Sequence, residues 1–275
     1  MLRGHTAKYH PKTNSPSKVM ILCQHDGDGR DFLTQTPHLP PKLGVSAETI
    51  IQYFQIERDI GSSALVDALT KFLSLDILVL EFNLPRGIVD PNRYPIDALS
   101  RLFKLEEQPE FREALLAAHR DYTTAVESAF SEFGPQFYLD IHTMSGYSLS
   151  APARTDSIEG HIESWLNNRG KPRAVDLITK DQNGKMIADD KVTSAIEAAF
   201  TSLDIRTVRD DPFKWMPNIR STAYLERNKG AAVDIPKPLL CINPDGALDE
   251  LIVDIEKVEK IARAIARELN KLFPR

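Results

Sequence analysis

Short apolar runs alternate with longer amphipathic segments along this chain, which predicts strands alternating with helices. The strand-like runs, of which the last is broken by proline, cover residues 18–23, 76–81, 136–141, 174–180, 205–210 and 230–242. Apolar residues at helical spacing indicate helices within residues 58–75, 106–132, 190–203 and 247–273. This order predicts one α/β domain, residues 18–275, with a mixed, mostly parallel sheet flanked by helices.

Two segments show neither pattern. The first seventeen residues, MLRGHTAKYHPKTNSPS, are polar and lack the apolar stretch of a secretory signal. We therefore expect a flexible N-terminal lead-in over residues 1–17. The segment that follows the first strand is rich in Pro, Thr and Gly up to about residue 45, and we expect an inserted loop over residues 28–57.

The composition restricts the class of partner. The chain has 275 residues, of which 42% are hydrophobic, with 34 basic and 39 acidic side chains. A net charge of −5 without Lys/Arg runs argues against nucleic-acid and membrane-surface partners, and no apolar run reaches the ~18 residues of a membrane span. Cys23 and Cys241 lie in apolar runs, so we expect reduced core thiols in a cytoplasmic protein.

Three of the predicted strands end in polar residues that a core strand does not need. His25 follows the first strand, and His142 ends another. The loop EFNLPRGIVDPNRYP (81–95) sets two arginines and an asparagine between prolines. Asp59 stands at the start of a helix. Because the carboxyl ends of parallel strands and the helix starts that follow them meet at one edge of a sheet, we expect these residues to lie together.

Two imidazoles and a carboxylate form the ligand set of a catalytic zinc, whose fourth position is left to water. His25 and His142 are therefore candidate ligands. The carboxylate stays open, since Asp26 and Asp28 are alternatives, His25-x-x-Asp28 is a compact metal-binding spacing, and Asp59 is equally suited to cap a helix. The other histidines lie in tail, loop or helix-surface contexts, where we expect structural roles. They are His5, His10, His38, His119 and His161.

At these residues the chain resembles the N-formylglutamate amidohydrolases, relatives of the zinc carboxypeptidases, of aspartoacylase and of succinylglutamate desuccinylase. Four blocks carry the resemblance: CQHDG (23–27), DIGSSALVDAL (59–69), PRGIVDPNR (85–93) and LDIHTMSG (139–146). They are similar to the family's His-x-Gly strand end, Asp-Ile-Gly-Ala helix start, Arg-x-x-x-Asp-x-Asn-Arg loop and Asp-x-His-Ser strand end. The resemblance implies a zinc-carboxypeptidase-like fold of the phosphorylase/hydrolase type.

The resemblance also implies a metal. His25, Asp59 and His142 would hold one zinc ion per chain. The family's helix-head carboxylate is here displaced by the inserted loop, which favours Asp59 over Asp28. Zinc lowers the pKa of a water molecule toward ~7 and polarises an acyl oxygen, which is the chemistry of amide hydrolysis.

The arginine loop is similar to the device with which carboxypeptidases grip a terminal carboxylate. The resemblance assigns Asn92 and Arg93, together with Arg86, to a substrate carboxylate, which a guanidinium binds in bidentate fashion. Asp90 would orient an arginine rather than meet the substrate. Arg86 is also the candidate for stabilising the developing oxyanion.

The general base departs from the family pattern. The family places a glutamate in a late strand, at the position where Pro236 stands in AAVDIPKPLL (231–240). Asp234, two residues earlier on the same strand face, is the candidate substitute. Glu226 in YLERNKG is the second choice.

Together these residues predict a zinc-dependent amidohydrolase that cleaves a small N-acyl amino acid, of the N-formyl type, or a related carboxylate-bearing amide. The substrate is then a small molecule, and the oligomeric state stays open. The missing glutamate supports an alternative, a non-catalytic domain that binds a carboxylate or a peptide terminus. A phosphate-ester hydrolase is a third alternative, although the sequence lacks the carboxylate-rich two-metal set of such enzymes.

Overall fold

The strand-like runs form one sheet in the computed structural model, which describes residues 4–12, 15, 17–154, 156–243 and 251–274. Its strands, in spatial order, are β1 (His5–His10), β3 (Asp76–Phe82), β2 (Lys18–Cys23), β4 (Phe137–Met144), β9 (Gly230–Pro236), β7 (Val175–Ile178) and β8 (Thr207–Arg209). β2 pairs in parallel with β3 and β4, as do β4 with β9 and β7 with β8. β1 and β7 run antiparallel to β3 and β9, so the sheet is mixed and mostly parallel, as the pattern predicts.

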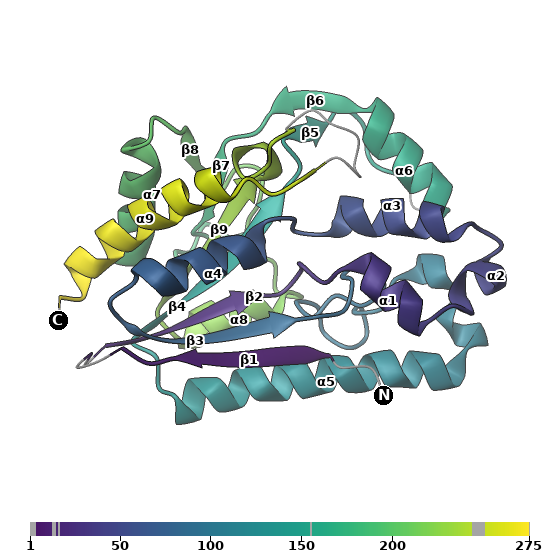
Figure 1. The fold of residues 1–275 in the computed structure, drawn as a ribbon, viewed down its shortest axis with the longest axis horizontal. Coiled ribbons are helices and arrows are strands. Elements are labelled where there is room, and N and C mark those ends of the chain that lie inside the picture. Colours follow the sequence, from purple (N-terminus) through teal and green to yellow (C-terminus); the bar gives the residue numbers. More distant parts are fainter. Residues whose placement is uncertain (1–3, 13–14, 16, 155, 244–250, 275) are drawn as a thin grey trace.

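Helices cover both faces of this sheet (Figure 1). They are α1 (Gly29–Gln35), α2 (Leu39–Leu43), α3 (Ala47–Glu57), α4 (Ser62–Phe72), α5 (Pro109–Glu132), α6 (Ile158–Asn167), α7 (Asp190–Thr201), α8 (Arg220–Arg227) and α9 (Ile255–Leu272). Successive side chains of a strand point to opposite faces. Val19 and Ile21 of β2 accordingly pack in one core with α4, α7 and α9, whereas Met20 and Leu22 pack in a second core with α3 and α5.

Part of the expected N-terminal lead-in is a strand. Residues 1–3, 13, 14 and 16 lie outside the described residues, but His5–His10 form β1, which pairs antiparallel with β3 from His5 opposite Phe82 to His10 opposite Ile77. The prediction of a flexible segment is wrong for these residues. β1 is an edge strand whose side chains stay half-buried or exposed, so its sequence carries no apolar signature.

The inserted segment over residues 28–57 is helical rather than an irregular loop. α1 begins where Asp28 Oδ1 accepts from the backbone N–H groups of Arg30 and Asp31, and α3 begins where Ser46 Oγ accepts from Thr49 N. The apolar face of α3 then packs into the second core, with Phe54 buried. The expected loop is therefore wrong, because proline and glycine separate three short helices here instead of preventing them.

Two predicted elements are shorter in the structure. The late strand ends at Pro236, where the 3-10 helix Lys237–Leu239 begins. The closing helix begins at Ile255, after its N-cap Asp254, while residues 247–250 of the prediction lie outside the described residues. Cys23 and Cys241 are buried free thiols, as expected. No helix in the described part of the chain is both long and apolar enough to span a membrane.

The fold brings the carboxyl ends of four parallel strands to one edge. β2, β3, β4 and β9 are adjacent and parallel, so the residues that follow or end them lie close together. A small second sheet of β5 (Tyr147–Leu149) and β6 (Arg169–Pro172) follows β4 at this edge. This edge carries the polar residues that the sequence singles out.

Candidate metal centre

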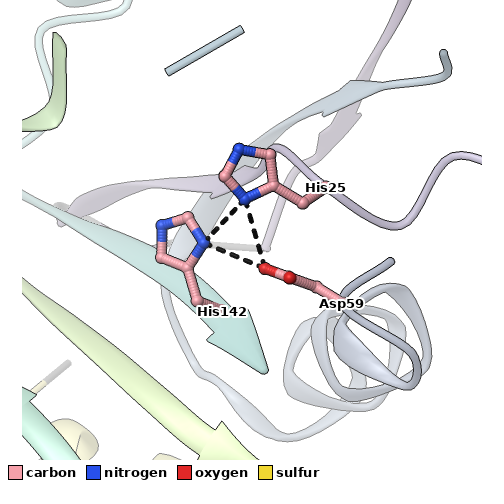
Figure 2. Close-up of side chains that lie close together, drawn as sticks. All are labelled: His25, Asp59 and His142. Atoms are coloured by element: carbon pink, nitrogen blue, oxygen red, sulfur yellow. Dashed lines mark hydrogen bonds and ion pairs between the residues drawn. The ribbon is translucent and has the colours of Figure 1, made fainter. Parts of the chain in front are cut away.

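Three side chains from separate segments converge at this edge (Figure 2). His25 follows β2, His142 lies near the end of β4, and Asp59 precedes α4. All three are buried. The backbone joins two of these segments, because Asp59 N donates to His25 O at 2.9 Å. We call these three residues the histidine triangle.

The triangle has the dimensions of a zinc site. The two Nδ1 atoms of His25 and His142 lie 3.1 Å apart, and they lie 3.3 and 3.0 Å from Asp59 Oδ2. Tetrahedral ligands that bind zinc at ~2.0–2.1 Å lie roughly 3.3 Å from one another. One cation at the centre would therefore reach all three atoms without rearrangement of the chain.

The hydrogen bonds at Nε2 of the two imidazoles leave the Nδ1 lone pairs directed toward the centre of the triangle. His25 Nε2 lies 2.9 Å from Asp90 Oδ1, and His142 Nε2 lies 3.0 Å from Asp140 Oδ1. A carboxylate on Nε2 fixes the proton there and leaves Nδ1 free to bind a metal. The residues therefore fit a bound cation, because the two Nδ1 atoms and Asp59 Oδ2 face one another and need either a cation or an added proton between them.

Electrostatics also favour positive charge inside the triangle. Burial opposes ionisation of Asp59, yet the charges of His25 and His142 hold the pKa of this carboxyl well below its ordinary value. Burial likewise opposes a charged His142, but Asp140 and Asp59 hold the pKa of this imidazole well above its ordinary value. Arg86 Nη1 lies 3.5 Å from Asp59 Oδ1 and 3.4 Å from His25 Nδ1. Asp59 inside the triangle, with Asp90 and Asp140 behind the two imidazoles, surrounds the centre with carboxylates.

A second layer of hydrogen bonds holds Asp140. Gln24 Nε2 donates to Asp140 Oδ1 at 2.9 Å, and Ser221 Oγ donates to Asp140 Oδ2. Ser221 N in turn donates to Asn92 Oδ1 at 2.9 Å. This network joins β2, β4, α8 and the arginine loop, so the orientation of His142 depends on four segments.

The two alternative carboxylates are occupied elsewhere. Asp26 Oδ1 and Asp28 Oδ2 bind Arg58 at 2.6 and 2.7 Å. We call Asp26, Asp28 and Arg58 the Arg58 cluster. Asp59 is not a helix cap, because the N-cap of α4 is Gly61 and no side-chain oxygen caps this helix. The structure therefore brings Asp59, and not Asp26 or Asp28, to the two histidines.

A cavity of about 220 Å³ opens beside the triangle. Its charged lining includes Asp59, Arg86, Arg173, Asp234 and Lys237. Its apolar lining includes Met144, Trp165 and Phe213. A small molecule that enters this cavity meets the candidate metal ligand Asp59 and several other charged groups at once.

Asp234 lies beside His142 and lines this cavity. Its partner across the β4–β9 pairing is His142, so the two side chains share a sheet face. Asp234 is buried, and its Oδ1 has no hydrogen-bond partner among the described residues. Burial, together with the negative charge of Asp59, raises the pKa of Asp234 to about 7. Glu226 is not brought to the site: it is exposed on α8, and its carboxylate lies 3.4 Å from Lys185 Nζ.

The residues of the arginine loop take different positions. Arg86 lines the cavity. Asn92 and Arg93 are not among the described residues that line it. Asn92 is buried and holds Ser221. Asp90 lies 3.8 Å from Arg86 Nη2 and 3.7 Å from Arg93 Nε, but it lies closer to His25. Asp90 is therefore first a partner of the imidazole and only second a partner of the arginines.

Comparison with solved structures shows which fold the chain shares. No protein-family model matches the chain, and no curated protein sequence matches it. N-formylglutamate amidohydrolase from Ralstonia eutropha JMP134 superposes with a TM-score of 0.61 at 15% sequence identity, over 99% of each chain. The chain has the fold of this enzyme. A gene product of Agrobacterium tumefaciens superposes equally well, with a TM-score of 0.61 at 15% identity over 98% of this chain and 96% of that chain.

Within this amidohydrolase fold, several site residues escape sequence analysis. Asp140 stands two residues before His142 in a strand, so strand alternation alone would have placed both on one face. His161, expected to be structural, lines the cavity, with its Nε2 3.0 Å from Glu57 Oε1. Ser221 and Lys237 carry no such signal, because tertiary packing alone brings them to the site.

Proposed function

We propose that this protein is a zinc-dependent amidohydrolase that cleaves a small N-acyl amino acid, of the N-formyl type, or a related carboxylate-bearing amide. The observation that carries the proposal is the histidine triangle, whose inward-facing Nδ1, Nδ1 and Oδ2 atoms are 3.0–3.3 Å apart beside a charged cavity. The full-length structural similarity to N-formylglutamate amidohydrolase supports the same reaction class. Zinc bound by His25, Asp59 and His142 would supply Lewis-acid activation of a water molecule and of the acyl oxygen.

The proton transfers are assigned to Asp234. Its Oδ1 accepts the proton of the attacking water and then passes that proton to the nitrogen of the leaving amine. A pKa raised to about 7 suits both steps, because about half of the carboxylate is ionised at neutral pH and the ionised form binds a proton readily. Arg86, beside Asp59 and on the cavity wall, donates to the acyl oxygen as negative charge develops there.

The cavity suits a small substrate. Its volume of about 220 Å³ is below the ~300–1,000 Å³ of typical drug-sized ligand pockets. Arg86, Arg173 and Lys237 on its wall offer cations to an anionic substrate, whereas Asn92 and Arg93, which the resemblance assigns to a carboxylate, are not among the described residues that line it. A short N-acyl amino acid meets both requirements.

Metal analysis combined with hydrolysis assays tests the proposal. We expect about one zinc per chain and release of the amine from N-formyl-L-glutamate or a related N-acyl amino acid. His25→Ala and His142→Ala should each lose both zinc and hydrolysis. His38→Ala, which removes an exposed imidazole, should keep both. A folded His142→Ala protein with full zinc content and activity would refute the proposal.

A non-catalytic binding domain is the competing function. Pro236, at the position of the family's glutamate, is the observation that favours it. Thermal melts of the protein with N-acyl amino acids, with and without zinc, distinguish the two. Stabilisation that is independent of zinc and comes without turnover supports the binding domain.

A further inference from the structure

The two arginines of the cavity differ in how their charges are balanced. Arg86 lies within 3.5–3.9 Å of the carboxylates of Asp59, Asp90 and Glu57. Arg173 has no carboxylate within ion-pair distance anywhere in the described chain, although Asp234 lines the same cavity. Arg86 is thus already neutralised by the protein, and Arg173 is not.

The guanidinium of Arg173 also has little hydrogen bonding within the described chain. Its Nε is buried and has no partner among residues that the structure describes. The one polar contact of its Nη1 is the sulfur of Met144 at 3.2 Å, and a thioether is a weak acceptor. Burial lowers the pKa of Arg173, although the charges of Asp234, Asp176 and Asp211 act in the opposite direction without reaching ion-pair distance.

Arg173 is nevertheless held in a defined place. Its backbone N donates to Gly146 O at 2.9 Å, directly after β6. Its guanidinium carbon lies 5.3 Å from the centre of the Phe213 ring, and Phe213 N donates to the buried Asp176 at 3.0 Å. A cation–π contact offsets only part of the cost of a desolvated charge. A guanidinium that is held on a cavity wall and has no carboxylate partner in the described chain is well suited to bind an anion.

We propose that Arg173 binds the carboxylate of the substrate. The inference rests on the proposed function and deepens it, because it adds a residue that the arginine loop does not contain. Arg173 and Asp59 line one cavity of about 220 Å³, so a carboxylate at Arg173 leaves the rest of a small N-acyl amino acid beside the metal ligands. The substrate class is therefore an amide whose carboxylate is close to the scissile bond.

Binding of matched acids and amides tests Arg173 without relying on turnover. The probes are N-formyl-L-glutamate and its two monoamides, with the α- or the γ-carboxylate replaced by a carboxamide. To keep hydrolysis from contributing heat, the variants are titrated in the zinc-loaded Asp234→Asn background, where one monoamide should bind about 10- to 100-fold more weakly than the acid. In Arg173→Gln the acid and that monoamide should bind equally, with zinc content unchanged. Arg173→Met, whose stem still packs on Phe213, repeats the test if the glutamine variant does not fold.

Two further arginines serve as controls. Arg206→Gln removes an exposed charge from a neighbouring groove that Arg173 also lines, and it should keep the preference for the acid. Arg93→Gln tests the arginine loop. The inference is overturned if Arg93→Gln abolishes the preference while Arg173→Gln keeps it, or if the protein with Arg173 intact does not distinguish the acid from either amide.

Hydrolysis assays of the same probes, with Asp234 intact, separate this inference from the proposed function. Preference for the acid that depends on Arg173, without hydrolysis of any probe, leaves the inference standing and refutes the hydrolase. Hydrolysis with an acid preference that survives in Arg173→Gln supports the hydrolase and refutes the inference.

Discussion

Two groups of carboxylates, the Arg58 cluster and the histidine triangle, lie next to each other at the carboxyl end of β2. They differ in the hydrogen-bond partners of their oxygens. In the Arg58 cluster, each oxygen of Asp26 and Asp28 receives an N–H group, from Arg58, from Ser63 N or from Arg30 N. In the histidine triangle, by contrast, Asp59 Oδ2 faces two imidazole Nδ1 atoms whose rings bind carboxylates through Nε2.

The difference shows which carboxylate is available for function. His25 and Asp26 are neighbours in sequence, as are Arg58 and Asp59, so position along the chain does not separate the two groups. The hydrogen-bond donors separate them, since N–H groups of the protein satisfy the Arg58 cluster, whereas the triangle needs an added proton or a cation. A satisfied cluster stabilises the fold, whereas a cluster of converging acceptors calls for a metal ion.

Replacing one aspartate of each group by asparagine should give the largest difference in zinc content and activity. Asp59→Asn removes the anionic ligand, so zinc content should fall from about one ion per chain to a small fraction, with hydrolysis reduced ~10³-fold or more, about 4 kcal/mol. Asp28→Asn should keep zinc and activity. Asparagine still caps α1, and loss of the partly exposed pair with Arg58 costs at most ~1 kcal/mol of folding free energy. Equal zinc contents in the two variants would contradict the comparison.

Zinc should stabilise the fold through the triangle alone. After dialysis against a chelator, addition of zinc at ~100 times its dissociation constant should raise the free energy of unfolding by about 2.7 kcal/mol. That corresponds to a rise of roughly 5–10 °C in Tm, measurable by calorimetry. His142→Ala should lose this shift and Asp28→Asn should retain it. Magnesium should give none, because it prefers oxygen ligands in octahedral geometry. A shift that persists in His142→Ala would place the zinc elsewhere.

The second layer should have a smaller effect than the ligands. Asp140→Asn keeps the shape of the side chain but removes the charge that orients His142, so zinc affinity should fall by ~10–100-fold. Competition with a coloured chelator measures this change. Asp26→Asn, an equally buried carboxylate of the Arg58 cluster, is the matched control and should leave zinc affinity unchanged. If the two variants lose affinity to the same extent, the effect belongs to general destabilisation and not to the imidazole.

The sequence predicts the parts of this molecule that depend on periodicity. The apolar runs of β2, β3 and β4 reveal the sheet, and parallel strand ends then bring His25 and His142 together. The choice between Asp59 and Asp28 does not follow from spacing, because both precede helices and only the paths of their chains decide which one faces the histidines.

Other features follow from tertiary packing alone. β1 is an edge strand that gains backbone hydrogen bonds rather than burial, so its composition remains that of a polar tail. Arg173 and Lys237 come from segments more than a hundred residues beyond Asp59, and no local pattern marks a cation as unpaired. The charge balance of a site is a property of the folded arrangement.

A third buried carboxylate extends the comparison to catalysis. Asp26 has Arg58 as its partner, whereas Oδ1 of Asp234 has no hydrogen-bond partner among the described residues. Burial, with the charge of Asp59, raises the pKa of Asp234 to about 7, and a bound cation will lower it again. Only the ionised carboxylate accepts a proton, so hydrolysis should be lost as the pH falls.

The pH profile of kcat/KM for N-formyl-L-glutamate should therefore rise with pH to a plateau. Its midpoint should lie at or below about 7, and below that midpoint kcat/KM should fall about tenfold for each pH unit. Zinc content measured at each pH excludes metal loss as the cause. The residual activity of Asp234→Asn should lack this acid limb, because the group that titrates is gone, whereas Glu226→Gln should keep the wild-type profile, since Glu226 lies on the exposed face of α8. An acid limb that persists unchanged in Asp234→Asn assigns the proton transfer to another group and leaves Asp234 as a buried carboxylate without a catalytic role.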